Sequence, residues 1–338
     1  MRPIEIFALS FFGKLSVEQI ERIISDSLSI DEILSANFME GYEKFKAHYD
    51  EDFLNDQQRR AQEIGARIID FWSEEYPELL RQSISPPAVL FCLGNTQLLK
   101  KNCVAVVGTR RATNYGKLVT KKIVPDLARS GLVIVSGMAF GIDSIAHQIA
   151  IESDGGTIAV LGTGVDVCYP ASNRKLYEKI IEDGCIVSEY PLGTKAAKHN
   201  FPARNRIIAG LCRATIVTEA PVESGALITA RIAAEMGRDV FAVPGDIDRQ
   251  TSQGCNWLLK MGAIPLTDSS QILEYYGISS SKQEKQDDFL QIFSQGPLLA
   301  EQIAEKLDLE LSEVLSKLTE YELNGLIMKF PSGHYNKV

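Results

Sequence analysis

Six short apolar segments, separated by stretches with helical periodicity, dominate the middle of this 338-residue chain. Their residues are continuously hydrophobic, which is typical of parallel strands that are covered on both faces. Strands that alternate with helices predict an α/β fold with a doubly wound, mostly parallel sheet. The six predicted strands are residues 104–107, 132–135, 157–161, 185–187, 214–217 and 240–243.

Small, polar or basic residues follow nearly all of these predicted strands. Ligands of doubly wound sheets bind beyond the carboxyl ends of the strands, so these loops are the expected binding surface. Exposed backbone amides, hydroxyls and arginines in such loops favour phosphate as the ligand. The loops read Gly-Thr-Arg-Arg at 108–111, Ser-Gly-Met-Ala-Phe-Gly at 136–141, Gly-Thr-Gly at 162–164, Ser-Glu-Tyr-Pro at 188–191 and Pro-Gly-Asp at 244–246.

The two ends of the chain predict separate, smaller domains. Residues 1–60 are expected to be helical, because their isoleucines keep helical spacing and Ser16 with Gln19 forms a capping-box pattern. The α/β domain is expected over residues 61–278. A polar stretch at 279–285 has the composition of a linker.

Residues 286–338 predict a winged-helix domain, with two amphipathic helices followed by a hairpin centred on Ser332-Gly333. Its presumed recognition helix is acidic, and DNA phosphates would repel it. We therefore expect this domain to contact protein more than a DNA groove. The helix carries Glu310, Glu313, Glu320 and Glu322 against only Lys317.

The net charge of −9 would by itself argue against a nucleic-acid partner. However, residues 1–60 hold 7 basic and 12 acidic side chains, and residues 283–338 hold 5 and 10. The centre is left with 23 basic and 22 acidic residues. A nearly neutral sheet domain with arginines gathered in its loops can therefore carry a basic pocket.

The chain shows no apolar run of membrane-spanning length and no secretion leader, so we expect a cytoplasmic protein without a membrane partner. Its six cysteines form no CxxC pair, which indicates buried thiols and no metal or disulfide framework. No G-x-G-x-x-G turn follows the first strand and no Walker A sequence occurs. Dinucleotide binding and ATP hydrolysis are therefore not expected, and neither is any other cofactor.

Two loops supply the first candidate ligand contacts. Arg110 follows Gly108 and Thr109 at the end of a strand, where close backbone approach and helix amides suit a phosphate. Phe140 follows Ser136-Gly137, and its ring either belongs to the core or stacks on an unpaired base.

The helix predicted after Pro202 holds the strongest cluster, Arg204-Asn205-Arg206. Arginines near a helix amino end oppose the helix dipole, so they require an anion or an acidic side chain nearby. The alternative to a bound phosphate is a structural ion pair with Glu189 or Glu219.

Another helix start, at Ser224-Gly225, offers further free amides. Asp143 and His147 share a helical face and predict a structural hydrogen bond, with Asp143 as a possible helix cap. No Ser/His/Asp set or close carboxylate pair suggests a catalytic site, so the sequence favours binding over chemistry.

Together these blocks resemble the DNA-processing protein A (DprA, also called Smf) family over about residues 70 to 268. The matching stretches are Val107-Gly108-Thr109-Arg110, Ser136-Gly137 with Ala139, Gly141-Ile142-Asp143, Ala146-His147, Tyr169-Pro170 with Asn173, Ser188-Glu189-Tyr190-Pro191, Phe201-Pro202 with Arg204-Asn205-Arg206, Ser224-Gly225 with Thr229-Ala230-Arg231, Val243-Pro244-Gly245 and Gly262-Ala263.

The resemblance implies an extended Rossmann-like domain that binds single-stranded DNA, protects it and loads a RecA-type recombinase during natural transformation. It implies a SAM-like or helix-hairpin-helix domain at the amino end, and homodimers formed through the sheet domain. Leu258, Leu259, Met261 and Ile264 are apolar residues suited to that dimer contact. The DNA contacts that it implies are Arg110, Gly137, Phe140, Lys175, Arg204, Asn205 and Arg206.

A function of another class remains open, namely a nucleotide-processing enzyme like the cytokinin-activating phosphoribohydrolases. Those enzymes use a P-G-G-x-G-T run followed by a glutamate. The corresponding stretch here reads Ala-Pro-Val-Glu-Ser-Gly at 220–225, and its glutamate has no assigned counterpart.

Overall fold

The computed structural model describes residues 1–35, 42–278, 288–323, 326–330 and 332–337. It divides into two compact units, Met1–Ile278 and Ser279–Val338. None of the described helices is long and apolar enough to cross a membrane.

A nine-stranded sheet forms the centre of the first unit, with the order β1-β2-β6-β5-β4-β3-β7-β8-β9. The strands from β6 to β9 in this order are parallel, whereas β2 joins β6 and β1 joins β2 in antiparallel fashion. The strands are β1 (Arg67–Asp70), β2 (Val89–Gly94), β3 (Cys103–Val107), β4 (Val133–Ser136), β5 (Thr157–Val160), β6 (Cys185–Ser188), β7 (Ala214–Val217), β8 (Asp239–Ala242) and β9 (Ile264–Pro265).

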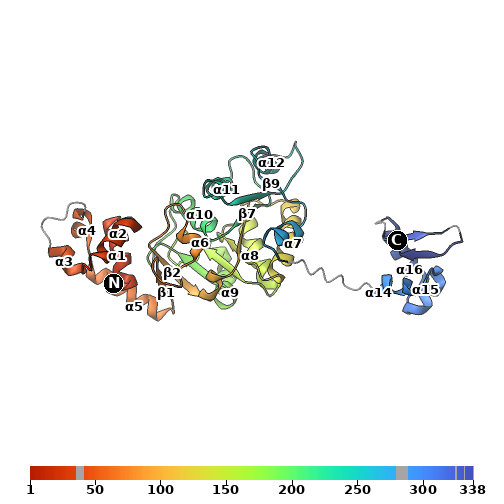
Figure 1. Cartoon of the computed structure of the whole chain (residues 1–338), viewed down its shortest axis with the longest axis horizontal. Coiled ribbons are helices and arrows are strands. Elements are labelled where there is room, and N and C mark those ends of the chain that lie inside the picture. Colours follow the sequence, from red (N-terminus) through yellow and green to blue (C-terminus); the bar gives the residue numbers. More distant parts are fainter. Residues whose placement is uncertain (36–41, 279–287, 324–325, 331, 338) are drawn as a thin grey trace. The chain divides into compact units, whose positions relative to one another are not determined.

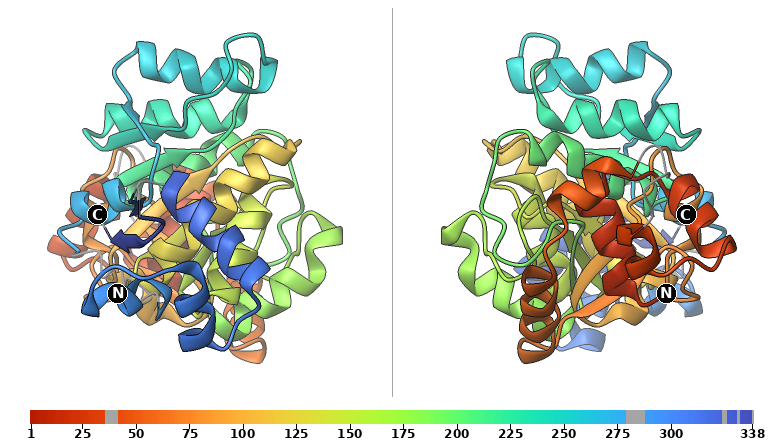
Figure 2. Two further views of the ribbon diagram at one scale, coloured as in Figure 1. Left: turned by 90° about the vertical axis from the view of Figure 1, so that its right-hand side faces the viewer. Right: turned by 90° about the vertical axis from the view of Figure 1, so that its left-hand side faces the viewer.

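Helices cover both sides of this sheet (Figure 2), which confirms the predicted doubly wound fold. Val104 and Val106 of β3 pack against α7 and α8, while Ala105 and Val107 share the opposite core with α10. Both faces are buried, as the unbroken apolar strands require. The helices of this region are α6 (Glu78–Arg81), α7 (Asn114–Arg129), α8 (Ile142–Glu152), α9 (Arg174–Asp183), α10 (Asn200–Gly210), α11 (Gly225–Glu235), α12 (Gln253–Lys260) and α13 (Ser270–Tyr275), with short 3-10 helices at Thr96–Lys100, Ala171–Asn173 and Gln250–Ser252.

All six predicted strands are present, as β3 to β8. The strands β1 and β2 were not predicted from the sequence. Strand order reverses between β3 and β7, since β4, β5 and β6 follow on one side of β3 and β8 and β9 lie beyond β7. This reversal is a topological switch point, where doubly wound sheets bind their ligands.

The amino-terminal helices pack against β1 and β2 (Figure 1). Ser16 and Gln19 form the predicted capping box at the start of α2. Phe7 of α1 meets Phe91 of β2 edge to face, with ring centroids 5.1 Å apart. This shared core joins the helical region and the sheet into one unit. The helices are α1 (Pro3–Gly13), α2 (Val17–Ser25), α3 (Ile30–Ser35), α4 (Glu43–His48) and α5 (Glu51–Glu63).

The second unit has its own apolar core, which includes Phe289, Ile303, Val314, Leu318 and Ile327. Its helices and hairpin follow the predicted order, and the winged-helix assignment itself stays a prediction. The predicted linker at 279–285 lies outside the described residues. The elements are α14 (Asp288–Gln291), a 3-10 helix at Ile292–Gln295, α15 (Ala300–Leu307), α16 (Leu311–Leu323), β10 (Ile327–Lys329) and β11 (Tyr335–Lys337).

Candidate nucleic-acid interface

A pocket of about 650 Å³ lies at the switch point of the sheet, and we call it the switch-point pocket. Loops that follow β3, β4 and β7 form its walls together with the first turns of α10 and α11. Its lining residues include Val107 to Arg111, Ala139, Asp143, Tyr169, Lys198, Phe201, Arg204, Asn205 and Pro221 to Thr229 in part.

Three cationic side chains, Arg110, Arg111 and Lys198, lie on the walls of this pocket and are exposed. Within the described part of the chain, none of them forms an ion pair. Glu223 is the one carboxylate on the exposed rim among the described lining residues. The pocket therefore presents net positive charge to a ligand.

Two aromatic rings, Tyr169 and Phe201, line the same pocket. Their centroids lie 5.3 Å apart with an interplanar angle of 33°. The guanidinium carbon of Arg110 lies 5.8 Å from the Phe201 centroid. Because Tyr169 is 47% exposed, one of its faces is available to a planar ligand.

Arg204 is 4% exposed and lies deeper than the sequence analysis expected of a DNA contact. Its Nη1 donates to the carbonyl of Gly137 at 2.9 Å and to that of Val160. Its Nε donates to Asn205 Oδ1 at 3.3 Å. Most of its donors are thus used by the protein, and its main physical effect is to tie together the ends of β4 and β5.

Gly137 allows this arrangement, because a Cβ atom there would lie 2.5 Å from Arg204 Nη2 and 2.8 Å from Asp143 Oδ2. Gly137 N–H also donates to Asp143 Oδ2 at 3.1 Å. Asp143 is the second residue of α8 and so does not cap the helix as expected. Gly137 therefore admits a buried guanidinium and its counter-charge.

Burial shifts the ionisation of this cluster. Desolvation raises the pKa of Asp143 to about 6, although the charge of Arg204 and hydrogen bonds oppose the rise. Desolvation lowers the pKa of Arg204 to about 10, which still leaves it charged at neutral pH. Burial, followed by the charge of Arg204, lowers the pKa of His147 to about 3.

The expected bond between Asp143 and His147 does not form. His147 Nε2 accepts from the Met138 N–H at 3.4 Å, and Nδ1 lies 2.7 Å from Thr157 Oγ1. Since Thr157 Oγ1 donates to the Ile134 carbonyl, Nδ1 carries the proton of a neutral imidazole. His147 therefore holds the β4 loop against β5 and faces no ligand.

Asn205 links α10 to α11 through a bond from its Nδ2 to the Gly225 carbonyl at 3.3 Å. Ser224 caps α11 by accepting from the Ala226 N–H at 3.3 Å. Both Ser224 and Gly225 line the switch-point pocket, with open space beside the Gly225 Cα. This helix start remains a predicted amide site.

The other predicted loop residues divide into lining and supporting groups. Gly108 and Thr109 line the pocket, and Thr109 N–H donates to the Glu219 carbonyl at 2.7 Å. A Cβ atom on Gly108 would lie 2.5 Å from Ile142 Cγ1, so glycine is required there for packing. Ser136 is buried and donates to the Val106 carbonyl at 2.7 Å, so its hydroxyl braces two strands.

Phe140 and Lys175 lie outside the walls of the pocket, on a loop and a helix that a hydrogen bond joins. Phe140 is 49% exposed, which settles that it is not a core residue. Asn173 Nδ2 donates to the Met138 carbonyl at 3.0 Å and ties the start of α9 to the loop of Phe140. Lys175 is exposed on the first turn of that helix.

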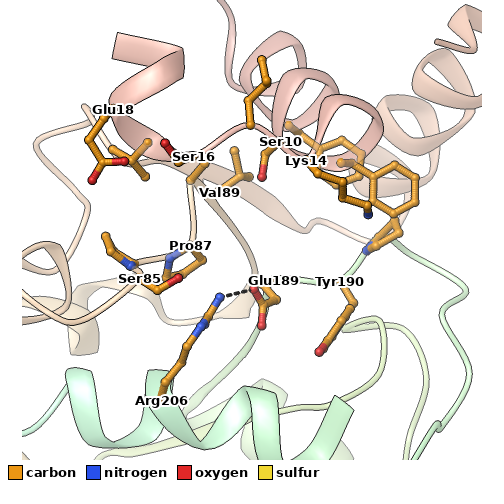
Figure 3. A pocket seen from close by; sticks show the side chains of 17 residues that line it. Ser10, Lys14, Ser16, Glu18, Ser85, Pro87, Val89, Glu189, Tyr190 and Arg206 are labelled. Carbon is orange, nitrogen blue, oxygen red and sulfur yellow. Dashed lines mark hydrogen bonds and ion pairs between the residues drawn. The ribbon is translucent and has the colours of Figure 1, made fainter. Parts of the chain in front are cut away.

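Arg206 points into a different cavity from the one that Arg204 and Asn205 line. Its Nη2 lies 2.5 Å from Glu189 Oε2, drawn as a dashed line in Figure 3. This is the ion pair that the sequence analysis held as an alternative to phosphate. The structure therefore brings together Arg110, Arg204 and Asn205 and leaves Arg206 elsewhere.

The residues predicted for dimer contact also divide. Leu258 belongs to the domain's own core with Cys255, because α12 turns both of them toward β8, and Leu259 packs partly against that core. Met261 is 65% exposed and Ile264 lies exposed on β9. Trp257, which the sequence analysis did not select, is also exposed on α12.

Lys198, Tyr169 and Phe201 are the lining residues to which the sequence analysis gave no role. Tyr169 and Phe201 each precede a proline in stretches that were quoted only for the family resemblance. Lys198 lies shortly before the arginine cluster. The presence of an aromatic or basic residue next to these stretches could have indicated that the three side chains line the pocket.

Comparison with known proteins identifies the family. A family model described as DNA recombination-mediator protein A matches residues 67–277. The chain belongs to this family.

In the described residues, no group of three His, Cys, Asp or Glu side chains could hold a metal ion.

Relatives match over the sheet domain and, in part, beyond it. The DNA processing protein DprA of Streptococcus pneumoniae is 48% identical over 198 residues, which are 59% of this chain and 70% of that protein. Protein Smf of Escherichia coli is 37% identical over 280 residues, 78% of this chain and 75% of its own. Protein Smf of Synechocystis is 49% identical over 207 residues, 60% of this chain and only 52% of its own.

Two solved structures share the fold. DprA of Streptococcus pneumoniae superposes with a TM-score of 0.71 and 37% identity, and the match covers 81% of this chain and 98% of that one. DprA of Helicobacter pylori, described for its single-stranded DNA binding mode, gives a TM-score of 0.57 and 32% identity. That match covers 62% of this chain and 95% of the other.

The buried histidine makes a testable contribution to stability. His147 has an unfolded pKa near 6.5 and a folded pKa of about 3, so its contribution is present above pH 6.5 and is lost as the pH falls toward 3. Between pH 7.5 and 4.5, the stability advantage over a His147→Gln variant should shrink by about 2 to 3 kcal/mol. Urea unfolding at several pH values measures this difference.

Asp143 acts in the opposite direction between about pH 4 and pH 6, because its folded pKa is raised. It is present in both proteins, so its effect largely cancels from their difference. A difference that stays constant with pH would show that the folded state tolerates a charged His147.

Proposed function

We propose that this protein binds single-stranded DNA in the switch-point pocket. The observation that carries the proposal is the combination, in one pocket, of unpaired cations with an aromatic pair in which Tyr169 is exposed. Arg110, Arg111 and Lys198 have no acidic partner, so they would attract the phosphates of a DNA backbone. Tyr169 and Phe201 offer aromatic surface to the bases. Cationic grooves with aromatic platforms are how proteins bind single strands without reading sequence.

A single strand suits this site better than a duplex. Bases in a duplex are stacked on each other, so their faces are not free to meet Tyr169. The match to a Helicobacter pylori protein described as a single-stranded DNA binder supports the same ligand. Phe140 and Lys175, on the neighbouring loop and helix, are proposed to extend the path of the strand.

We further propose that the protein acts by binding and not by catalysis. Glu219, which directly precedes the stretch compared with phosphoribohydrolases, is buried and accepts bonds from Thr113 N and Oγ1 at 2.9 and 2.6 Å, whereas Glu223 within that stretch is exposed on the pocket rim. Glu219 serves to hold the start of α7. Incubation with AMP and with oligo-dT tests this proposal: base release from AMP would favour the enzyme.

Protection of incoming DNA and loading of a RecA-type recombinase during natural transformation form the finer part of the proposal. Membership of the recombination-mediator family supports it. The test is an assay of recombinase filament formation on single strands coated with single-strand-binding protein. Addition of this protein should shorten the lag, and an unchanged lag would contradict a loading function.

The Arg110 side chain should contribute a phosphate contact. We expect Arg110→Ala to weaken oligo-dT and oligo-dC binding alike by about 1.5 to 3 kcal/mol, because phosphates carry no base identity. The log-log salt slope should become shallower by about 0.7, the value for one phosphate on a single strand. Fluorescence anisotropy at several salt concentrations measures both quantities.

Arg129→Ala is the matched control, since Arg129 lies exposed at the far end of α7 and is paired with Asp126. Its affinity and salt slope should equal those of the unsubstituted protein. Loss of binding to one base only would make Arg110 a base contact.

The exposed rings should stack on bases. Tyr169→Ala and Phe140→Ala should each reduce oligo-dT affinity by about 1 to 3 kcal/mol if their rings carry a base. Both rings are about half exposed, so neither change should lower the melting temperature much. If Tyr169→Ala weakens binding and Phe140→Ala does not, the strand stays within the pocket.

We propose a homodimer that uses the exposed apolar side chains at the end of the sheet, Trp257, Met261 and Ile264. A charged residue at the centre of such a contact would be desolvated without a partner. Met261→Lys should therefore produce monomers in sedimentation velocity at micromolar concentration. A monomer before substitution would refute the dimer itself.

A further inference from the structure

A second cavity of about 660 Å³ lies between the amino-terminal helices and the sheet (Figure 3). We call it the junction cavity. The turn between α1 and α2, the segment that enters β2, and the residues after β6 form its walls, and Arg206 of α10 reaches it from the sheet domain. Cavities of this size at the junction of two substructures are typical small-molecule sites.

One wall of the junction cavity is aromatic and apolar. Phe7 and Phe11 stack with centroids 5.2 Å apart and an interplanar angle of 20°. Pro86, Pro87 and Pro191 add flat, rigid surface. Phe7 is 3% exposed and Phe11 also stacks on Phe53, with centroids 5.6 Å apart, so a planar ligand ring would meet the edges of these rings together with the prolines.

Arg206 lines this cavity and also has one hydrogen-bond donor without an acceptor. Its Nη2 is paired with Glu189, but its Nη1 is buried and has no acceptor in the described protein. A buried guanidinium nitrogen without a partner is costly, so an acceptor from a ligand would be stabilising. Phosphate and carboxylate oxygens are the strongest acceptors for arginine.

Lys14 adds a second positive charge at the edge of the cavity. Its Nζ lies 4.9 Å from the Phe11 centroid, and it forms no ion pair with a described residue. Glu18 also lines the cavity, and both Lys14 and Glu18 are exposed, so water screens the two opposite charges alike. Lys14 therefore attracts an anion only where the anion lies closer to Lys14 than to Glu18.

Hydroxyl groups complete the lining, from Ser10, Ser16, Ser85 and Tyr190. Burial and the charge of Glu189 raise the pKa of Tyr190 to about 12, so its hydroxyl remains a donor at neutral pH. A ring wall, two cations and several hydroxyls are complementary to a base, a phosphate and a sugar respectively.

We propose that the junction cavity binds a small anion that carries an aromatic ring, of the class of the nucleoside monophosphates. The phosphate lies toward Arg206 and Lys14, and the ring lies against the wall of Phe7 and Phe11. The site is separate from the switch-point pocket, since consecutive residues of α10 line one or the other.

Calorimetric titration of the full chain with AMP tests the proposal, with adenosine and inorganic phosphate as partial ligands. AMP should bind at least ten times more tightly than either, because each lacks one half of the recognised chemistry. Absence of AMP binding up to millimolar concentration would overturn the proposal.

Variants locate the site. Lys14→Gln should weaken AMP binding about tenfold, whereas Arg22→Gln, a control on the exposed side of α2, should leave it unchanged. Glu189→Gln should strengthen AMP binding, because it removes the carboxylate that competes for Arg206. A gain of affinity cannot come from a protein that fails to fold.

The remaining comparison separates the junction cavity from the DNA site. Arg110→Ala should leave AMP binding unchanged, and excess oligo-dT should not displace AMP. If Arg110→Ala abolishes AMP binding and Lys14→Gln does not, AMP occupies the switch-point pocket and the junction cavity is not the site.

Discussion

The buried charge of Arg204 is the constraint on which the switch-point pocket depends. Its guanidinium replaces lost hydration with the carbonyls of Gly137 and Val160, and Asp143 supplies the counter-charge. Removal of one partner of a buried pair is far more costly than the net stabilisation that the pair gives. Each loop that leaves β4 and β5 is therefore held in one place, and the pocket is formed before any ligand arrives.

Because of this constraint, the buried residues of the pocket support its structure and the exposed residues are left to contact a ligand. Buried residues such as Arg204, His147 and Ser136 have their hydrogen-bonding groups engaged with the protein. Exposed residues such as Arg110 and Tyr169 do not. This arrangement suits a ligand that has a regular backbone and variable bases. The exposed side chains can adapt to the ligand while the buried residues hold the loops fixed.

The sequence predicted the parallel strands well because each is a continuous apolar run between helices. It missed β1 and β2, since β1 has only four residues and β2 begins just after Pro86 and Pro87, which are typical of irregular segments. The binding loops could be predicted because each directly follows a predicted strand. The sequence could not show how deeply each loop side chain is buried.

Arg204 and Arg206 are two residues apart in one motif, yet the geometry of α10 sends them to different cavities. Side chains two residues apart on a helix point about 200° away from each other around its axis. Charged residues that are neighbours in the sequence therefore need not lie together in the structure. Likewise Leu258 and Met261 belong to one apolar stretch, and the structure buries the first and exposes the second.

Both edges of the sheet are closed to further strands. At one edge β9 has only two residues, and Pro265 has no N–H to offer. At the other, β1 carries Arg67 and Asp70, and Arg67 is paired with Glu75. Short, charged or proline-bearing edges prevent open-ended pairing of sheets. Any association of two copies at β9 must therefore be held mainly by side chains, because the short edge strand offers too few backbone groups to continue the sheet.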